Sequence, residues 1–506
     1  MSAERARAHL EKRFASLIQL EEVSAILDCD TAVMMPPESA SSRAEATAAL
    51  RELSHERLID PAVEAWLEEA ESTPAEDPWV AANLRTMRHR WIHAIAVPSD
   101  LVTALTKIES LCEIRWREAK SAADFAQVAP SLTELVYLVQ QVGQAKGERL
   151  QRLPYEALLD QYEPGARLDK LDSLFTALAE DFLPTLLDAA LTRQRHCNPP
   201  RLPAGPFSPE LQRQVGLRFM ADLGFDFKHG RLDVSHHPFC GGTCDDVRIT
   251  TRYDTADFTS SLMGILHETG HALYEFGLPR AWRWQPVGRA CSTSLHESQA
   301  LLIEMQACRS REFLTYAAPL LRTAFGSDDS AWDAENLYGH YTWVEPSCIR
   351  VSADEVTYLA HIILRYQLEK ALIASKLTVA DLPAAWDKAM TSLLGVTPPN
   401  DRLGCLQDIH WYTGAFGYFP TYTLGAMIAA QLFDAACRAD TTLLPGLASG
   451  NFIPLLTWLR RHVHAYGAFF LSADDLLQAA TGKPLDVSVF QRHLKQRYLE
   501  QGSEPY

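Results

Sequence analysis

Two histidines four residues apart, His267 and His271, constrain this chain more than any other feature, and a glutamate follows the first of them directly. On an α-helix, residues at positions i and i+4 lie about 40° apart around the axis, so both imidazoles can face one ion. Glu268 lies on the same side and can reach a water molecule on that ion without being a ligand. The pattern therefore predicts half of a zinc site with a general base beside it.

The surrounding residues predict the helix that this arrangement needs. Thr255 or Asp257 can cap its start, and Gly277 followed by Pro279 ends it. Apolar residues recur between these ends at helical spacing, namely Phe258, Leu262, Ile265, Leu266, Ala272, Leu273 and Phe276. The alternative is a helix with two ordinary histidines that form hydrogen bonds in the core.

A third ligand is expected because a zinc hydrolase takes three protein ligands and keeps the fourth position for water. Two histidines and a glutamate are a standard set, and Glu297 lies in a second predicted helix, within SLHESQALLIEMQACRSREF. We expect Glu297 to be this ligand, since His296 and Ser298 beside it are suited to orienting a ligand. Glu304, two turns further on, is the competing ligand. The alternative for Glu297 is an exposed helix glutamate.

Composition favours a soluble intracellular enzyme. The chain has 506 residues, 47% of them hydrophobic, which is enough for a large core. A formal net charge of −17 argues against a nucleic-acid surface, because phosphate binding needs clustered Lys and Arg. The charged start does not resemble a secretory signal, and an apolar run of about 18 residues is absent. We therefore expect a cytoplasmic protein with neither nucleic acid nor membrane as a partner.

The ten cysteines are scattered without a paired framework, which is typical of a reducing compartment. Cys240 and Cys244 form a CxxxC pair that could bind metal or form a disulfide, but no second pair lies at zinc-finger spacing. We expect a structural use for this pair, with a redox or second metal role as the alternative.

Helical periodicity dominates the chain, and neither an internal repeat nor a flexible linker divides it. We expect one mainly α domain over residues 1–506, with two helical lobes around a cleft. The segment LGAMIAAQLFDAAC predicts a buried helix. The segments FDFKHGRLDVS and DVRITTRY alternate residue types and predict a hairpin or a small three-stranded antiparallel sheet beside the zinc helix. Such an edge could hold an extended peptide through backbone hydrogen bonds.

Several further blocks carry a resemblance to a known family. They are DTAVMMPPESASSR from Asp30, HPF from His237, DVRIT from Asp246, HESQ from His296, IRVSAD from Ile349 and GCLQDIHW from Gly404. In type and order these blocks, with HETGH, resemble the carboxypeptidase Taq family of metallocarboxypeptidases, whose zinc motif is of the HExxH, gluzincin-like kind. The resemblance covers most of the chain. It implies a large helical two-lobed metallopeptidase with a deep active-site cleft, and a homodimer.

One departure from the family pattern stands in the N-terminal block. That pattern suggests tryptophan before the aspartate, and this chain has Cys29 before Asp30. Cysteines also stand at Cys240 and Cys244 beside the HPF and DVRIT blocks. None of these residues is an expected ligand, so the departures bear on substrate preference or local packing rather than on the chemistry.

A hydrolytic mechanism follows from the expected groups. Zinc lowers the pKa of its water to about 7 and polarises the scissile carbonyl. Glu268 would take the proton from that water and deliver it to the leaving amine. The oxyanion needs a second donor, and we expect Tyr422 with help from His410, since related zinc peptidases place a His and a Tyr in this order. Tyr418 competes with Tyr422, and a role as a core aromatic residue is the alternative for each.

A carboxypeptidase must also recognise a free C-terminal carboxylate, which a planar guanidinium binds with two hydrogen bonds. Arg350 is the leading candidate, because the resemblance places the IRVSAD block at the active site. Asp354 could hold it from four residues further along a helix, and a purely structural Arg350–Asp354 pair is the alternative. Weaker candidates for lining the cleft are His237, Arg248 and Asp246.

Three functions fit these residues. The first is a zinc carboxypeptidase that removes single residues from peptides with a free C-terminus, with one Zn²⁺ per chain and Co²⁺ or Mn²⁺ as possible substitutes. The second is an oligopeptidase of related architecture, which would release internal fragments instead. The third is a zinc-stabilised binding protein without catalysis. Glu268 argues against the third, because a closed structural zinc site has no use for a poised base.

Overall fold

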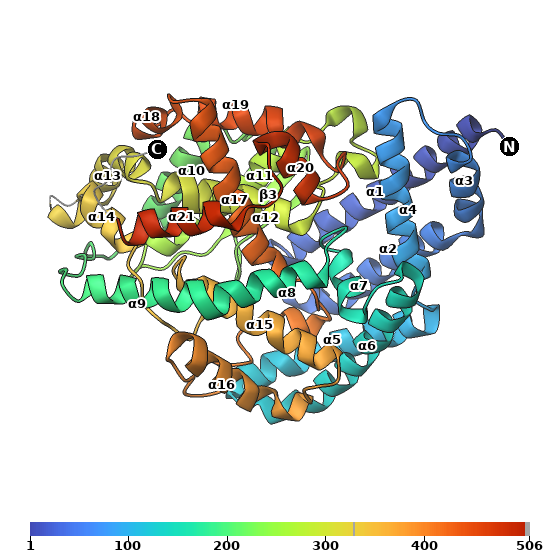
Figure 1. The fold of residues 1–506 in the computed structure, drawn as a ribbon, viewed down its shortest axis with the longest axis horizontal. Coiled ribbons are helices and arrows are strands. Elements are labelled where there is room, and N and C mark those ends of the chain that lie inside the picture. Colours follow the sequence, from blue (N-terminus) through green and yellow to red (C-terminus); the bar gives the residue numbers. More distant parts are fainter. Residues whose placement is uncertain (327–328, 501–506) are drawn as a thin grey trace.

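The computed structural model describes residues 1–326 and 329–500 and is built almost entirely of helices (Figure 1). The first helices are α1 Ala3–Val33, α2 Ala40–Ile59, α3 Pro61–Glu71, α4 Pro78–Ile95, α5 Ser99–Ala122, α6 Ala129–Leu150, α7 Pro154–Asp160, α8 Leu168–Ala177, α9 Leu183–Gln194 and α10 Pro209–Asp222. After a short sheet follow α11 Thr259–Gly277, α12 Thr293–Leu301, α13 Arg311–Phe325, α14 Ala334–Tyr341, α15 Thr357–Ile373, α16 Leu382–Leu394, α17 Pro420–Ala439, α18 Leu443–Ala448, α19 Ile453–His462, α20 Ala473–Thr481 and α21 Val487–Tyr498. The predicted mainly α fold class is confirmed.

The sheet has three strands, β1 Gly230–Val234, β2 Phe239–Thr243 and β3 Asp246–Thr251, in the order β1-β3-β2. β2 pairs antiparallel with β3, but β1 pairs parallel with it, so the sheet is mixed and not wholly antiparallel as predicted. The chain reverses once between β1 and β2 and again between β2 and β3, which gives β1 and β3 the same direction. β2 begins at Phe239, the last residue of the HPF block, in a segment that the sequence did not mark as a strand.

The helix that carries the HETGH motif, α11, begins and ends as predicted. Asp257 caps it, since its side chain accepts hydrogen bonds from the backbone N–H groups of Thr259 (2.8 Å) and Ser260 (3.4 Å). The helix ends at Gly277, two residues before Pro279. Side chains of α11 pack on the sheet in one apolar cluster that includes Leu232, Val247, Ile249, Ile265 and Ala272. The histidine pair therefore stands on a rigid helix with the sheet behind it.

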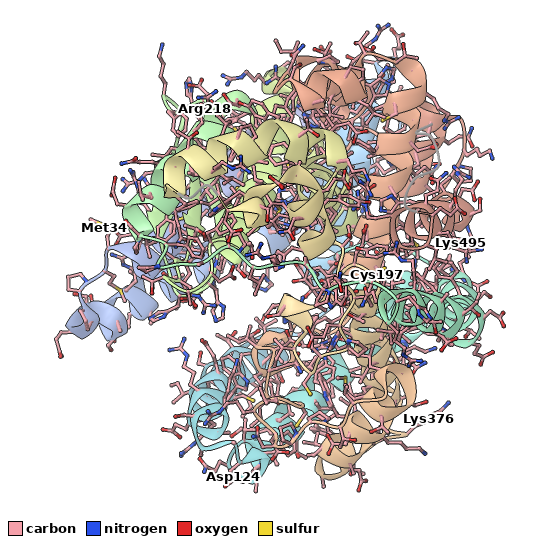
Figure 2. All side chains as sticks on the ribbon, turned by 90° about the vertical axis from the view of Figure 1, so that its left-hand side faces the viewer. Met34, Asp124, Cys197, Arg218, Lys376 and Lys495 are labelled. Atoms are coloured by element: carbon pink, nitrogen blue, oxygen red, sulfur yellow. The ribbon has the colours of Figure 1, made fainter. Side chains whose placement is uncertain are left out.

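Two large apolar clusters make up most of the core, and α17 contributes to both. Met427 belongs to the cluster formed with α5, α6, α8, α9, α15 and α16, and the adjacent Ile428 belongs to the cluster formed with α10 to α14 and α18 to α20. In the side view, Asp124 and Lys376 mark one end of the molecule and Arg218 marks the other (Figure 2). α17 is the buried helix predicted from the segment LGAMIAAQLFDAAC.

Two glycines allow α11, α12 and α17 to approach closely. A Cβ atom on Gly270 would lie 2.6 Å from the backbone of α12 at Gln299 and Ala300. A Cβ atom on Gly425 would lie 2.9 Å from Cγ of Glu297. Since real Cβ contacts are not that short, only glycine fits at these positions. The glycine of the HETGH motif thus sets the distance between the two helices that carry the expected ligands.

The state of the cysteines and the hydropathy of the helices bear on two expectations from the sequence. All ten cysteines are free thiols, Cys240 and Cys244 included. None of the helices in the described part of the chain is long and apolar enough to cross a membrane.

Candidate metal centre and active site

His267 and His271 of α11 face Glu297 of α12. Nε2 of His267 lies 3.8 Å from one carboxylate oxygen of Glu297, and Nε2 of His271 lies 3.6 Å from the other. One donor atom from each residue lies within 4.8 Å of the other two. All three side chains are largely buried. The structure therefore gathers two imidazole nitrogens and a carboxylate from two helices around one point.

Glu304 contacts the opposite edge of the same histidine. It lies in a π-helical turn, η6 Leu302–Cys308, which follows α12 directly. Its carboxylate accepts a 2.9 Å hydrogen bond from Nδ1 of His267, and Arg309 forms a 2.5 Å ion pair with it. The proton on Nδ1 of His267 therefore points at Glu304, and Nε2, on the other side of the ring, faces Glu297. A carboxylate behind a histidine in this way fixes the ring and the tautomer that a metal ligand needs.

His296 orders the surroundings of His271. The two rings stack with centroids 4.4 Å apart, and Nε2 of His296 lies 3.0 Å from Glu275. Burial, followed by the charges of His296 and His267, lowers the pKa of His271 well below its usual value, so this imidazole is neutral. Ser298, the other neighbour singled out in the sequence, donates instead to the backbone carbonyl of Leu295 at 2.7 Å and contacts neither histidine.

Glu268 is buried beside this group, with 7% of its surface exposed, and its carboxylate forms neither a hydrogen bond nor an ion pair within the described residues. Burial raises the pKa of Glu268 to about 7, with Glu297 adding to the rise and His267 opposing it. A carboxylate with a pKa near neutrality can both accept and release a proton at pH 7. Glu268 has the environment of an acid–base group rather than that of a structural ion pair.

The charges and donors of this cluster suit a divalent cation. Burial lowers the pKa of His267, but the hydrogen bond to Glu304 and the charges of Glu297 and Glu268 outweigh it and raise this pKa to about 10. The same negative field attracts a dication. Imidazole nitrogen with carboxylate oxygen is a donor set suited to zinc, and two of the three donors are already held in place.

Arg350 lies in a short 3₁₀ turn, η8 Arg350–Ser352, and is buried. Its Nε and Nη2 donate to Asp408 at 3.0 and 2.8 Å, and Nη1 donates to the hydroxyl of Tyr358 at 3.1 Å. The predicted partner Asp354 was wrong. Asp354 instead caps α15, since Val356 and Thr357 donate their backbone N–H groups to it, both at 3.0 Å. The 3₁₀ turn ends at Ser352 and no α-helix runs from residue 350 to 354, so the four-residue spacing did not bring the two side chains together.

His410 and Tyr422 adjoin the same arginine. Nε2 of His410 lies 3.3 Å from the hydroxyl of Tyr422, and the guanidinium carbon of Arg350 lies 4.9 Å from the Tyr422 ring centroid. Burial and the charges of Arg350 and Arg365, against the opposing charge of Asp408, lower the pKa of His410 to about 4. Burial raises the pKa of Tyr422 well above its usual value, so its hydroxyl keeps its proton. The pair presents a neutral imidazole and a phenol that can donate.

Tyr418, the competitor of Tyr422, lies in the same aromatic cluster. Its ring is 5.4 Å from that of Tyr422 and 5.2 Å from that of Tyr162. Of the two tyrosines, however, only Tyr422 forms a hydrogen bond with the His410 ring. The structure therefore brings Tyr422 and His410 together as a pair, with Tyr418 beside them.

The arginine group and the carboxylate–histidine group belong to one site. The charge of Arg350 is among those that lower the pKa of Glu297, and Glu297 is among those that raise the pKa of Tyr422. The carboxylate–histidine cluster and the arginine thus share a single electrostatic environment. The family resemblance led us to expect the IRVSAD block, which contains Arg350, near the metal motif.

The weaker candidates lie at the sheet. Arg248 forms a bidentate pair with Asp246 on β3, with its shortest bond 2.7 Å long, and within the described residues no interaction connects this pair with Arg350. His237 is exposed in the segment between β1 and β2. Burial and then the charge of Lys120, which belongs to α5, lower its pKa. His237, Arg248 and Asp246 therefore lie on the sheet or next to it, and not in the cluster around Arg350.

Sequence reasoning missed two residues that hold Arg350, namely Asp408 and Tyr358. Asp408 accepts from Arg350 through one oxygen and from Nε of Arg365 through the other, at 2.7 Å. Arg350 and Arg365 lower the pKa of Asp408 far enough to outweigh its burial. A signal was present, because Asp408 lies two residues before His410 in the GCLQDIHW block.

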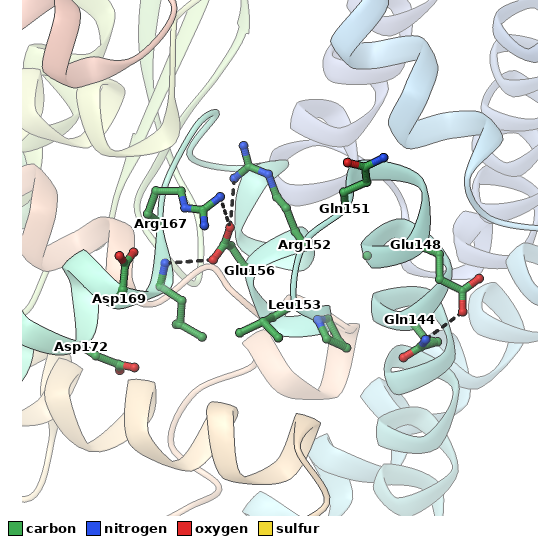
Figure 3. Close-up of a pocket in the computed structure, with 12 residues that line it drawn as sticks. Gln144, Glu148, Gln151, Arg152, Leu153, Glu156, Arg167, Asp169 and Asp172 are labelled. Carbon is green, nitrogen blue, oxygen red and sulfur yellow. Dashed lines mark hydrogen bonds and ion pairs between the residues drawn. The ribbon is translucent and has the colours of Figure 1, made fainter.

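A separate open depression of about 630 Å³ lies away from this site, between α6, α7 and α8 (Figure 3). Its lining is mostly polar and charged, and Arg152 and Arg167 lie 3.5 and 3.1 Å from Glu156 at its centre. None of the residues expected to act in catalysis lines it. Both of its arginines are therefore already paired with an acid.

The helical fold, the HExxH histidines with a glutamate from a second helix, and the free buried glutamate together define a metallopeptidase of the HExxH class. Comparison with known proteins narrows this class. The family model for carboxypeptidase Taq (M32) metallopeptidase matches residues 9–498. The chain therefore belongs to this family, whose members require a divalent metal, and it is a metallocarboxypeptidase.

Individual relatives agree over nearly the whole length. Thermostable carboxypeptidase 1 of Thermus thermophilus is 38% identical over 494 residues, which cover 95% of each chain. Thermostable carboxypeptidase 1 of Pyrococcus furiosus is 32% identical over 489 residues, 96% of this chain and 97% of that one. The solved structure of Trypanosoma cruzi metallocarboxypeptidase 1 superimposes with a TM-score of 0.95 at 37% identity, covering 98% of this chain and 99% of that one.

Proposed function

We propose that this enzyme is a zinc carboxypeptidase that releases single amino acids from peptides with a free C-terminus. The observation that carries the proposal is the position of a buried, doubly anchored arginine next to the carboxylate–histidine cluster. An endopeptidase has no need for a buried cation at that position. A binding protein has no need for Glu268, whose pKa lies near 7.

The metal would be held by Nε2 of His267, Nε2 of His271 and the carboxylate of Glu297. When bound, a divalent ion of this kind supplies Lewis-acid polarisation of the scissile carbonyl and lowers the pKa of water to about 7. Zinc is the proposed ion because two imidazoles and one carboxylate, with an open fourth position, are a common catalytic zinc set. Cobalt and manganese are the proposed substitutes.

Glu268 would accept the proton of the attacking water on its carboxylate and then deliver it to the nitrogen of the leaving amino acid. Its burial supports both steps, because a pKa of about 7 balances acceptance and release at neutral pH. The hydroxyl of Tyr422 would donate a hydrogen bond to the developing oxyanion. His410, neutral and within 3.3 Å of that hydroxyl, would orient it.

Arg350 would bind the substrate's terminal carboxylate. A guanidinium has five N–H donors, and Asp408 and Tyr358 accept from three of them. The two that remain are enough for a carboxylate. Asp408 and Tyr358 fix the plane of the group, so little conformational entropy is lost when substrate binds. His237, Arg248 and Asp246 would contact the rest of the peptide from the sheet.

We also propose a domain organisation, a cellular location and an oligomeric state. A single domain over residues 1–506 agrees with the contribution of α17 to both core clusters. A cytoplasmic location agrees with ten free thiols. A homodimer is implied by the family. Light scattering after gel filtration would measure the oligomeric state, and cell fractionation would find the compartment.

Arg350→Ala tests the proposal with a double comparison. Loss of a desolvated charge pair costs about 2 to 5 kcal/mol, so kcat/KM on a free-acid peptide should fall by about 30- to 1,000-fold or more. Amidation of the peptide should harm the wild type to a similar extent, whereas the variant should scarcely distinguish acid from amide. Arg248→Ala is the matched control and should keep the preference for the free acid. If Arg350→Ala kept that preference, Arg350 would not be the carboxylate receptor.

A further inference from the structure

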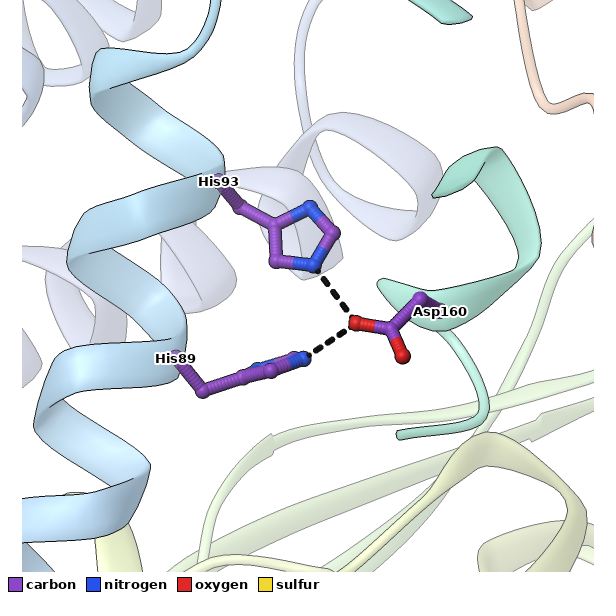
Figure 4. A group of neighbouring side chains, drawn as sticks. All are labelled: His89, His93 and Asp160. Carbon is purple, nitrogen blue, oxygen red and sulfur yellow. Dashed lines mark hydrogen bonds and ion pairs between the residues drawn. The ribbon is translucent and has the colours of Figure 1, made fainter. Parts of the chain in front are cut away.

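A second pair of histidines with the same spacing lies far along the chain from the first. His89 and His93 are four residues apart on α4, and both face Asp160 at the end of α7 (Figure 4). Nε2 of His89 lies 2.7 Å and Nε2 of His93 lies 2.9 Å from the same carboxylate oxygen, Oδ2. The donor atoms lie within 4.8 Å of one another. Outside the active site this is the only such group of three found in the described residues.

The remaining contacts of Asp160 point its free oxygen at the histidines. Oδ1 accepts the backbone N–H of Gly165 at 3.0 Å and an ion pair from Arg152 at 3.1 Å. Oδ2 contacts only the two imidazoles among the described residues. The hydrogen bond and the ion pair at Oδ1 thus fix the orientation of the Asp160 carboxylate. Carboxylates that bind a metal are held by hydrogen bonds in the same way.

The ionisation states are those that a metal requires. Burial lowers the pKa of His93, so its imidazole is neutral at pH 7. Hydrogen bonds from His89, His93 and Gly165 outweigh the effect of burial and lower the pKa of Asp160, so it is a carboxylate. A neutral imidazole and a charged carboxylate bind a cation without first losing protons. In the structure Nε2 of His93 donates to Asp160, and a metal bound at Nε2 would shift the single ring proton to Nδ1, which is buried without a partner.

We propose that His89, His93 and Asp160 form a second site for a divalent transition metal, held through the two Nε2 atoms and Oδ2. Two imidazoles and one carboxylate suit zinc or cobalt and not magnesium or calcium, which prefer oxygen ligands. The side chain of His89 is 30% exposed, which leaves a path from solvent and room for water as a further ligand. The proposal does not depend on the peptidase mechanism.

This second site would bind metal without catalysing hydrolysis. The residue after its first histidine is Arg90, at the position that Glu268 holds in the first pair, and Arg90 pairs with Glu21. The site therefore has no base to accept a proton from water.

A metal bound here would connect α4 to Asp160, the last residue of α7, and so to the loop that follows it. In that loop the backbone carbonyl of Tyr162 accepts a 2.8 Å hydrogen bond from Thr293, and Glu163 accepts a 3.3 Å hydrogen bond from Ser294. Both donors belong to the first turn of α12, the helix that carries Glu297. The metal would stabilise this part of the fold against unfolding, since a ligand that binds only the native state adds to its stability.

The second site should be the weaker of the two. Arg152 lies 3.1 Å from Asp160 and offsets the charge that would attract the ion. The first site has three buried carboxylates, Glu268, Glu297 and Glu304, around its histidines. In a series of chelators of increasing strength, the weakest should therefore remove the second metal first. Peptidase activity should then stay within about twofold of its starting value.

Metal stoichiometry tests the proposal. The full-length wild type, dialysed to equilibrium against buffered Zn²⁺ or Co²⁺, should hold two ions per chain by mass spectrometric metal analysis. His89→Gln should hold one ion and keep peptide hydrolysis. His271→Ala should also hold one ion but should lose peptide hydrolysis. His196→Gln, which changes an exposed histidine in neither site, should hold two.

The change at His89 is mild because this residue is partly exposed, and Asp160→Asn provides a second route to the same loss. Each of these variants should also lose the zinc-dependent rise in the midpoint of thermal unfolding that the weaker site gives. A wild type that holds only one ion, lost with His271→Ala, would overturn the proposal. A second ion that persists in both His89→Gln and Asp160→Asn would overturn it as well.

Discussion

Two helices of this protein, α4 and α11, each direct a pair of histidines at a carboxylate from another helix, yet the two sites differ in everything around that pair. On α11 the intervening residue is a free buried glutamate, and Glu304 holds the outer edge of His267. On α4 the equivalent residue is Arg90, and Nδ1 of the buried His93 has no partner. Asp160 is paired with Arg152, whereas Glu297 stands among further carboxylates.

The difference shows that H-x₃-H spacing specifies a place for a cation but not a reaction. Helix geometry alone brings two imidazoles together, and it does so on both helices. Catalysis also needs a base with a pKa near neutrality, an anion receptor and an oxyanion donor. In the proposed mechanism these groups are Glu268, Arg350 and Tyr422, and within the described residues only the pair on α11 has them close by.

The largest expected effect comes from removing the base. Glu268→Gln should keep the metal but lower kcat by about 10²- to 10⁴-fold, since the ligands survive and the proton acceptor does not. Arg90→Gln changes the equivalent residue of the other pair and loses only a surface ion pair, so its kcat should stay near that of the wild type. Steady-state kinetics together with metal analysis measure both. A Glu268→Gln enzyme that holds metal and turns over normally would remove this residue from the mechanism.

The next largest effect distinguishes the proposed ligand, Glu297, from Glu304, which holds the other edge of His267. Glu297→Gln should weaken metal binding most, because it removes a donor and a charge. Glu304→Gln should weaken it by about 10- to 100-fold, since it loosens the orientation of His267. Competition with a chromophoric chelator gives both affinities. If Glu297→Gln bound metal with normal affinity while Glu304→Gln lost much of it, Glu304 and not Glu297 would be the ligand.

The smallest effect concerns the packing that brings the ligands together. Gly270→Ala should destabilise the fold by about 1 to 3 kcal/mol, because its Cβ would meet the α12 backbone at 2.6 Å. Gly264→Ala is a matched control on the same helix, where the nearest atom lies 3.9 Å away, so it should be neutral or mildly stabilising. Denaturant unfolding measures both. Equal stability in the two variants would show that close approach of α11 and α12 is not needed.

The sequence predicted the parts of the site that depend on local geometry. His267, Glu268 and His271 lie on one helix whose cap, Asp257, and final Gly277 were readable from residue types alone. The order of a His and a Tyr in related zinc peptidases suggested His410 and Tyr422 as a pair, and the structure places Nε2 of His410 3.3 Å from the Tyr422 hydroxyl.

Other features depend on contacts between distant segments. Asp408 holds Arg350 from 58 residues away, and no helical spacing connects them. Glu304 reaches His267 from a π-helical turn, which changes the register expected from an α-helix. Asp160 lies 71 residues from His89, so the second histidine pair had no visible partner in the sequence. The direction of β1 likewise depends on which strand it pairs with.

The central claim is that the site on α11 removes single residues from a free C-terminus with the help of a metal. A mass-spectrometric time course on one unblocked peptide, with and without a strong chelator, tests it most directly. The account predicts a ladder of products, each shorter by one C-terminal residue, that stops when the chelator is added and resumes with zinc. Internal fragments, or a ladder that the chelator does not affect, would contradict it.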